Sequence, residues 1–415
     1  MDELSFKIRN ILAIDLKSFY ASVECIDRHL DPFKVPLIVC DPDRGGNSIV
    51  MAVSPYLKAK GIPSRCRRKD VPDIAGLIVA VPRMARYLEV SATINDIYLR
   101  HVDEKNLHVY SIDESFLDVT NFLRCERKTP REIAETIIGE VKRETGLTVC
   151  AGIGDNLFMA KAAMDIEAKH NPDFIAEWHR GDIAKKLWPV SPLSKIWGIG
   201  ERMEIKLNRL GLYTAGEVAA FDPHELVNRF GVIGGEIWLH CNGVDRAIIE
   251  EKRDRPRASM SVGQQLHLGA SGEDIHLLAR EMGRELAIRL ARENLSCRGI
   301  CLWMSGDDLW SNHLEAGRGI STSTEIVASI ERMLEGRIPA RIFRIGAVAY
   351  DLSPASFMQL DLETDWKKRE KDEALDRTMA RIKDTFGPAS IFRLSALHRG
   401  STHLRRAIQI GGHKA

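Results

Sequence analysis

The stretch 111–118 constrains the fold of this chain more than any other, because it places two adjacent acidic residues between two short apolar runs. Residues 107–110 precede the acids and residues 116–119 follow them, and both runs have the composition of strands. Neighbouring side chains of a flat strand point to opposite faces, so Asp113 and Glu114 converge only if the backbone bends between them. Two acids at a bend suggest a divalent cation site, whereas a solvated hairpin turn is the simpler interpretation of this stretch alone.

A third acidic residue, near the start of the chain, favours the metal interpretation. Residues 11–14 form a continuous apolar run typical of a buried strand, and Asp15 follows at its end. Ser18 is then a candidate N-cap for a helix. We therefore expect Asp15 at the carboxyl end of a central strand, where α/β folds place their chemistry. Three carboxylates at neighbouring strand ends repel one another unless a cation neutralises them, and hard oxygen ligands suit Mg²⁺ and two-metal phosphoryl transfer.

These residues carry a resemblance to a known family. Residues 13–24, Ala-Ile-Asp-Leu-Lys-Ser-Phe-Tyr-Ala-Ser-Val-Glu, and residues 111–118, Ser-Ile-Asp-Glu-Ser-Phe-Leu-Asp, resemble in residue, order and spacing the two catalytic motifs of Y-family translesion DNA polymerases. The chain is similar to the branch of bacterial polymerase V catalytic subunits and Gram-positive ultraviolet-repair polymerases, with polymerase IV a near relative. The resemblance covers almost the whole chain and implies template-directed, error-prone DNA synthesis past damaged bases, in DNA repair and the SOS response.

The resemblance implies which residues form the active site. Asp15, Asp113 and Glu114, with the backbone carbonyl of Leu16, would bind two Mg²⁺ ions and carry catalysis. Tyr20 lies where the family keeps an aromatic steric gate, although a helix-face core aromatic is the simpler interpretation of its position. The nucleotide-binding residues that the resemblance implies are Ser18, Phe19, Tyr20, Lys58 and Lys161. The fingers of this family often carry a tyrosine, followed three residues later by a basic residue that meets the triphosphate. Here Pro55 stands in place of the tyrosine and Lys58 supplies the basic residue, with Lys60 as an alternative.

The implied architecture is an α+β multidomain fold of the right-hand polymerase type. Its parts are a palm at 1–31 and 82–180, fingers at 32–81, a thumb at 181–248, a linker at 249–257, a little finger at 258–353 and a C-terminal tail at 354–415. The patterns predict strands at 48–53, 147–154, 259–268, 298–304 and 344–352, and helices at 55–61, 83–101, 132–145, 277–293, 322–334 and 366–386.

DNA contacts are expected in the last two folded parts. Residues 196–202 have the form of a helix-hairpin-helix, in which Gly198 and Gly200 would turn backbone amides toward a DNA phosphate. Ser259 and Ser261 are the expected contacts of the little finger, with Gln264 a further candidate. The formal net charge of +1 shows no overall basic excess, so the cations that hold primer-template DNA must be gathered locally.

The tail carries a candidate partner motif. Residues 358–362, Met-Gln-Leu-Asp-Leu, resemble the peptide that bacterial polymerases insert into the sliding clamp, with Gln359, Leu360 and Leu362 as the contacts. Glu363 stands where an aromatic residue is usual. The polymerase V branch also uses an accessory dimer and a recombinase filament, so these are further candidate partners.

Composition sets limits on the cell compartment. No apolar run approaches the roughly eighteen residues of a membrane helix, and the N-terminus lacks the form of a signal peptide, so we expect a cytoplasmic protein without membrane contact. The eight cysteines show no Cys-x-x-Cys spacing, which favours free thiols over disulfides or a zinc site.

Two other functions compete with the polymerase. The first is a catalytically silent DNA-binding accessory protein on the same scaffold, against which the presence of all three carboxylates argues. The second is a nucleotidyl cyclase, which shares the acidic chemistry but has no use for the helix-hairpin-helix or the little finger. Activity without a template would identify a cyclase.

Overall fold

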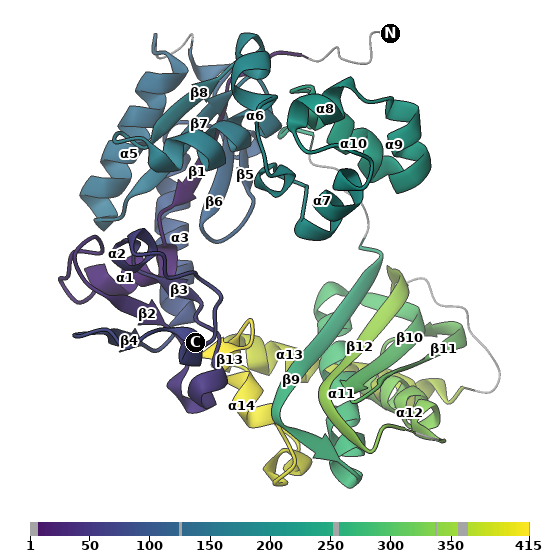
Figure 1. Cartoon of the computed structure of the whole chain (residues 1–415). Helices are drawn as coiled ribbons and strands as arrows, with labels where there is room; N and C mark the ends of the chain where they lie inside the picture. Colours follow the sequence, from purple (N-terminus) through teal and green to yellow (C-terminus); the bar gives the residue numbers. More distant parts are fainter. Residues whose placement is uncertain (1–6, 124–126, 252–256, 337, 356–363, 415) are drawn as a thin grey trace. The chain divides into compact units, whose positions relative to one another are not determined.

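The structure is a computed structural model that describes residues 7–123, 127–251, 257–336, 338–355 and 364–414 of the 415-residue chain. The chain forms two compact units, Met1–Arg253 and Asp254–Ala415, which run from purple to teal and from green to yellow in Figure 1. Both units combine helices with a β-sheet, so the predicted α+β class is confirmed. The predicted linker at 249–257 falls largely outside the described residues.

The first unit is built on a five-stranded sheet in the order β5-β6-β1-β7-β8. Its strands are β1 (Ile11–Leu16), β5 (Leu107–Val109), β6 (Glu114–Asp118), β7 (Val149–Gly154) and β8 (Ile175–Trp178). β1 pairs antiparallel with both β6 and β7. The strand that carries Asp15 is therefore central, as its continuous apolar run predicted.

Helices cover both faces of this sheet (Figure 1). They are α3 (Met84–Tyr98), α5 (Pro130–Thr145) and α6 (Leu157–Ala162). Helix α1 (Phe19–Ile26) instead packs on strands β2 (Leu37–Val39) and β3 (Ala52–Val53). On one face Ala13 of β1 and Phe116 of β6 pack with Leu157 and Ala160 of α6. Side chains alternate along a strand, so Ser115 points to the other face, where it meets Asn95 of α3.

Two glycines of β7 allow α6 to approach the sheet. A Cβ at Gly152 would lie 2.1 Å from the carbonyl oxygen of Ala160, and one at Gly154 would lie 2.3 Å from the amide nitrogen of Ala160. Both neighbours are backbone atoms, which cannot rotate away. Only glycine fits, because any side chain would push α6 off the sheet.

We therefore expect Gly154→Ala to lower the free energy of unfolding of the first unit by about 2 kcal/mol, the usual cost of an overpacked core. Gly139→Ala is the matched control, since a Cβ at this exposed position of α5 meets nothing within 4 Å. Alanine is the better helix former, so the control should gain roughly 0.5–1 kcal/mol. Urea unfolding followed by circular dichroism measures both, and equal stability of the two variants would contradict the packing argument.

A small three-stranded sheet follows α1, in the order β3-β2-β4. Its elements are β2 (Leu37–Val39), β3 (Ala52–Val53), α2 (Pro55–Ala59) and β4 (Ile78–Ala80). The strand predicted over 48–53 is shorter than expected, because Val50 exchanges backbone hydrogen bonds with Arg65 and Cys66 in a loop. The predicted short helix is confirmed, with Ser54 as its N-cap.

The first unit ends in a helical subdomain made of α7 (Glu201–Asn208), α8 (Ala215–Ala220), α9 (Pro223–Phe230) and α10 (Val232–Cys241). The loop before α7 contains Gly198 at φ +91°, a left-handed conformation that favours glycine. Gly200 is the N-cap of α7 and is exposed. The turn therefore has the glycine-dependent form that residues 196–202 predicted.

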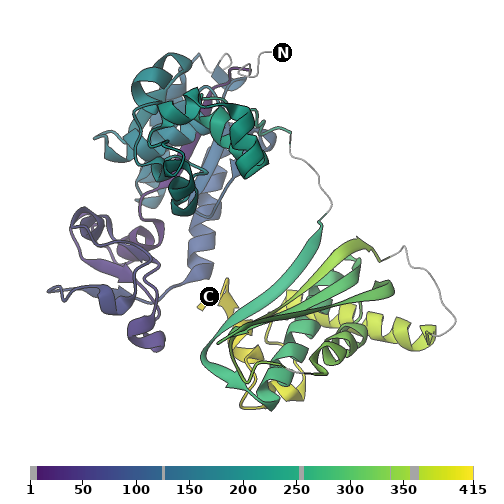
Figure 2. The ribbon, with the colours of Figure 1, turned by 45° about the vertical axis from the view of Figure 1, so that its right-hand side comes forward.

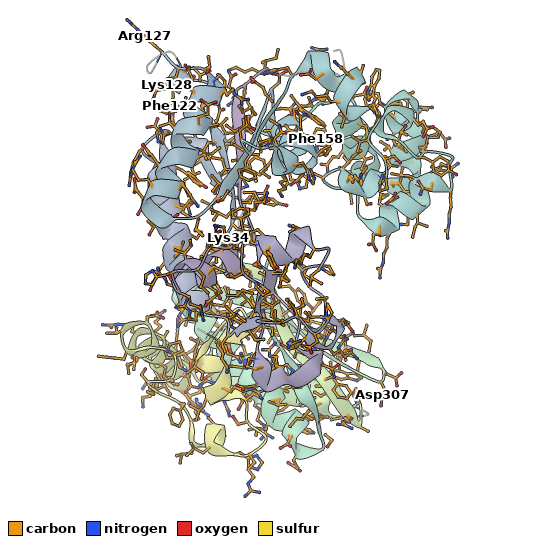
Figure 3. All side chains as sticks on the ribbon, turned by 60° about the vertical axis from the view of Figure 1, so that its left-hand side comes forward. Lys34, Phe122, Arg127, Lys128, Phe158 and Asp307 are labelled. Atoms are coloured by element: carbon orange, nitrogen blue, oxygen red, sulfur yellow. The ribbon has the colours of Figure 1, made fainter. Side chains whose placement is uncertain are left out.

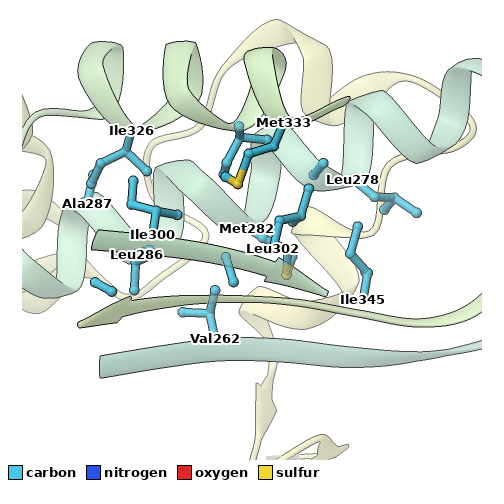
Figure 4. Packing of buried hydrophobic residues seen from close by; sticks show 14 of the residues in the cluster. Val262, Leu278, Met282, Leu286, Ala287, Ile300, Leu302, Ile326, Met333 and Ile345 are labelled. Carbon is cyan, nitrogen blue, oxygen red and sulfur yellow. The ribbon is translucent and has the colours of Figure 1, made fainter. Parts of the chain in front are cut away.

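The second unit has a four-stranded sheet, order β11-β10-β12-β9, whose helices gather on one face (Figure 2). The elements are β9 (Ser259–Ser271), α11 (Glu273–Glu293), β10 (Leu295–Gly306), β11 (Leu309–Ile320), α12 (Ser323–Leu334) and β12 (Arg341–Pro354). Figure 4 shows Val262 and Leu302 of the sheet pointing toward Met282 and Leu286 of α11. Strand β11 was missed by the sequence analysis, because this edge strand is largely exposed and has no buried apolar run.

The C-terminal residues pack on this second unit. They form α13 (Trp366–Phe386), α14 (His403–Ala407) and the hairpin strands β13 (Gln409–Ile410) and β14 (His413–Lys414). The helix predicted over 366–386 is confirmed, and α13 contacts α11. Thr402 donates its backbone amide to the buried carboxylate of Glu281 at 3.3 Å. The clamp-binding peptide predicted at Gln359, Leu360 and Leu362 lies outside the described residues.

Candidate active site

The acidic residues predicted from two distant stretches lie on adjacent strands. Asp15 of β1 and Glu114 of β6 are direct partners in the antiparallel register, so their side chains share the face that α6 covers. Asp113 precedes β6 in the bend that the sequence predicted, and its carbonyl oxygen accepts a hydrogen bond from the Leu16 amide at 2.9 Å. The pairing of β1 with β6 therefore brings all three acids to one end of the sheet.

Two lysines and a fourth acid complete this site. Lys169 lies 2.5 Å from Asp15 and 2.8 Å from Asp165, as measured between the ammonium and the carboxylate oxygens. Lys161 lies 2.7 Å from Glu114 and 3.0 Å from the second oxygen of Asp165. Asp165 thus bridges the two lysines. Lys161 was predicted from the sequence, whereas Lys169 and Asp165 were not, since only the helical spacing after β7 could have indicated them.

Burial is the main influence on the charge of these acids. It raises the pKa of Asp15, and the neighbouring charge of Asp113 acts in the same direction, while Lys169 opposes both. Burial also raises the pKa of Glu114, against the ion pair with Lys161. The ionised forms are therefore costly without a nearby cation. The two lysines partly supply that positive charge, and a bound metal ion would supply more.

The donor set fits a hard divalent cation. Within the described ranges, no three acidic, histidine or cysteine side chains already converge on a point that a metal ion could occupy. The predicted ligands are nevertheless carboxylates on paired strands, together with the carbonyl group of Leu16, and oxygen ligands of this kind suit Mg²⁺. The ammonium groups of Lys161 and Lys169 form ion pairs with Glu114 and Asp15, so positive charge already lies beside two of the carboxylates that would bind a metal cation.

Tyr20 is held rigidly beside these acids. Its ring stacks on Tyr87 of α3 with centroids 4.6 Å apart. The Tyr87 hydroxyl donates to the fully buried carboxylate of Glu24 at 2.8 Å, and Arg83 contacts the same oxygen at 2.9 Å. Burial raises the pKa of Tyr20, and the charge of Asp113 adds to this effect, which places the phenol close to the acidic bend. The ring is partly exposed, so it combines packing against Tyr87 with an accessible surface.

Positive charge gathers near the start of α1. Burial lowers the pKa of Lys17, and the positive charges of Lys58 and Lys169 lower it further. Lys17 also donates to the carbonyl oxygen of Lys169 at 3.1 Å. Phe19 is buried in α1. Ser18 occupies the N-cap position, but the side-chain cap predicted for it is wrong, because the residue adopts φ 50° and its hydroxyl makes no cap bond.

Lys169 should matter for nucleotide binding. With a metal cation on Asp15, the Lys169 ammonium would be available to a triphosphate, and a hydrogen bond between charged groups is worth roughly a tenfold change in affinity. We therefore expect Lys169→Gln to raise the KM for the incoming nucleotide about tenfold, with a smaller change in kcat. Steady-state primer extension measures this, with the exposed Lys185→Gln as matched control. An unchanged KM would contradict this role.

The candidate DNA contacts lie in both units. In the first, Gly198 and Gly200 are exposed at the turn before α7. In the second, Ser259 and Ser261 are exposed on the face of β9 opposite the core. Gln264 belongs to the other face, where its oxygen accepts a hydrogen bond from Thr402 at 2.8 Å. The expectation that Gln264 contacts DNA is therefore wrong, because the alternation of the strand turns it inward.

Comparison with known proteins identifies related chains. Residues 14–165 match the impB/mucB/samB family, and residues 180–212 match the helix-hairpin-helix motif of that family. The UV-damage repair protein UvrX of Bacillus subtilis (strain 168) is 35% identical, with all of both chains covered. A DNA polymerase IV of the same organism is 30% identical, with 98% of this chain and 99% of the relative covered.

A solved structure has the same fold. A Y-family DNA polymerase chimera superposes with a TM-score of 0.67 at 20% identity, which covers 82% of this chain and 98% of the chimera. Among the described helices, none combines the length and the apolar character that crossing a membrane requires.

Proposed function

The chain belongs to the impB/mucB/samB family of Y-family DNA polymerases, and we propose that it copies DNA past damaged bases with Asp15, Asp113 and Glu114 at the centre of its active site. It is a DNA-directed DNA polymerase that performs translesion synthesis in DNA repair, and its substrates are DNA and nucleotides. The register that sets Asp15 opposite Glu114 is the observation that carries the assignment of the active site.

Polymerases of this family use divalent metal ions, and we assign two Mg²⁺ ions to this site. Asp15, the carbonyl group of Leu16, Asp113 and Glu114 would hold them. When bound, such ions lower the pKa of the primer 3′-hydroxyl and offset the charge of the triphosphate and the leaving pyrophosphate.

The chain's own residues position the reactants. The antiparallel pairing of β1 with β6 fixes the acids before substrate arrives. The first amides of a helix have no carbonyl partners in a preceding turn, so those at the start of α1, with Ser18, Phe19 and Tyr20, would favour phosphate oxygens. The lysines around them, Lys17, Lys58, Lys161 and Lys169, would neutralise the triphosphate. The rigid ring of Tyr20 would crowd a ribose 2′-hydroxyl and so select deoxynucleotides.

The remaining parts would hold the DNA. We assign the five-stranded sheet with its helices to the palm, the three-stranded sheet with α2 to the fingers, and α7–α10 to the thumb. The second unit corresponds to the little finger, followed by the tail. Gly198 and Gly200 would bind a DNA phosphate through backbone amides, and Ser259 and Ser261 would contact the DNA backbone from the open face of β9.

Partners follow from the same family. The peptide with Gln359, Leu360 and Leu362 would attach the polymerase to the sliding clamp. Attachment to the clamp would compensate for low processivity. An accessory dimer or a recombinase filament would act as in polymerase V, within the SOS response.

Primer extension tests the proposal. The full chain is given Mg²⁺, deoxynucleotides and a primed template, either undamaged or with an abasic site. Addition that follows the template sequence and continues past the abasic site is the expected result. Tight DNA binding without addition, with or without the clamp, would instead favour the catalytically silent accessory protein. Addition without a template would exclude both.

A further inference from the structure

Three aromatic side chains connect the turn before α7 with the acidic bend. Trp197 directly precedes Gly198, and its ring meets that of Tyr110 edge-on at 5.9 Å and that of Phe116 at 6.1 Å. The Trp197 indole N–H also donates to the Tyr110 hydroxyl at 3.4 Å. Tyr110 and Phe116 stand on either side of Asp113 and Glu114 in the sequence. One tryptophan therefore touches both flanks of the acidic bend.

The contacts continue on the other side of Trp197. Its ring lies parallel to that of His240 of α10 at 5.9 Å, and His240 stacks on Phe158 of α6 at 4.5 Å. Phe158 is fully buried and packs with the helices α7–α10 (Figure 3). It lies one helical turn before Lys161, which pairs with Glu114. The rings from Tyr110 and Phe116 through Trp197 and His240 to Phe158 therefore form one continuous series of contacts. It reaches the acidic site through Phe116 of β6 and through α6, which carries both Phe158 and Lys161.

We infer that Trp197 is a positioning residue, which fixes the acidic bend when the turn at Gly198 and Gly200 holds a DNA phosphate. This inference rests on the proposed function. The amides that would bind the phosphate follow Trp197 directly in the chain, so any shift of this turn moves the indole ring. Rings in edge and stacked contact cannot slide past one another without losing packing. Binding of the DNA backbone and alignment of the carboxylates are thereby coupled.

The competing interpretation is that Trp197 only fills space. A space-filling residue contributes to stability, and its loss lowers Tm without changing the rate at saturating substrate. A positioning residue affects kcat, because a displacement of about 1 Å at the reacting groups costs up to a hundredfold in rate. The two roles therefore differ in kcat measured with DNA and nucleotide both saturating.

The experiment compares single-nucleotide addition by Trp197→Leu, Trp197→Phe and Trp238→Leu. We expect Trp197→Leu to lower kcat about tenfold while the Kd for primer-template DNA changes less than about threefold. Trp197→Phe keeps a ring against Tyr110 and Phe116 and should recover most of the rate. Trp238 is the matched control, because it is a half-buried tryptophan of α10 whose N–H bonds the Phe221 carbonyl at 3.1 Å. Its loss should lower Tm and leave kcat unchanged.

Tyr110 supplies a second variant that does not threaten folding, since it is 48% exposed. Tyr110→Leu should also lower kcat, and combining it with Trp197→Leu should cause little further loss, because both remove the same contact. Unchanged kcat in both single variants, or an equal fall in Trp238→Leu, would overturn the inference while templated synthesis by the native chain still stood. Absence of templated synthesis by the native chain would instead overturn the proposed function.

Discussion

The variant Asp113→Asn/Glu114→Gln is expected to lose templated nucleotide addition by about a thousandfold or more, since each group that stabilises developing charge contributes roughly a hundredfold to a thousandfold. Both substitutions keep the size of the side chain and remove its charge. Glu114 faces Asp15 across paired strands, and Asp113 lies at the bend beside them, so the variant removes two of the three acids that we assign to the metal ions.

Two further measurements separate catalysis from folding in this variant. Without Mg²⁺ its Tm should be no lower than that of the native chain, because loss of the Asp113 charge relieves repulsion at Asp15 and Lys161 keeps its ion pair with Asp165 when Glu114 is neutral. Mg²⁺ should raise the Tm of the native chain but not of the variant, since a ligand stabilises only a fold that binds it. The matched control is Asp103→Asn/Glu104→Gln, an exposed pair of the same residue types, which should keep full activity. Retained synthesis by the active-site variant would exclude our assignment of the acids.

The second large effect is expected at Tyr20. Tyr20→Ala should reduce the preference for deoxynucleotides over ribonucleotides by about a hundredfold, as loss of a close steric contact does in other specificity pockets. The native ring cannot move aside, because it stacks on Tyr87, whose hydroxyl is tied to the buried Glu24. Addition of deoxynucleotides should remain measurable, since no acid or lysine of the site is removed.

Competition between the two sugar types in primer extension measures this preference as a ratio of kcat/KM values. Tyr20→Phe is the matched control, because it keeps the ring and its stacking and removes only the hydroxyl group. Its sugar preference should remain close to that of the native chain. If Tyr20→Ala discriminated as well as the native chain, Tyr20 would not be the steric gate.

Local sequence patterns were sufficient for most of the regular structure. The apolar run ending in Asp15 predicted a central strand, and the helical spacing over 366–386 predicted α13 with both of its ends. Such patterns work because they report which side of one element is buried. They were insufficient for β11, an exposed edge strand that lacks such a side, and for the strand at 48–53, which pairs with a neighbouring loop.

The sequence by itself determined the family, and it singled out the three acidic residues as candidates, because residue types at fixed spacing along one or two segments carry that information. Only the tertiary structure decided that Lys161 meets Glu114 and Lys169 meets Asp15, that Gln264 bonds Thr402, and that Trp197 meets Tyr110. These contacts join segments far apart in the chain. They depend on strand register and on how closely α6 packs on Gly152 and Gly154. Both are set by the packing of whole elements and not by any local pattern.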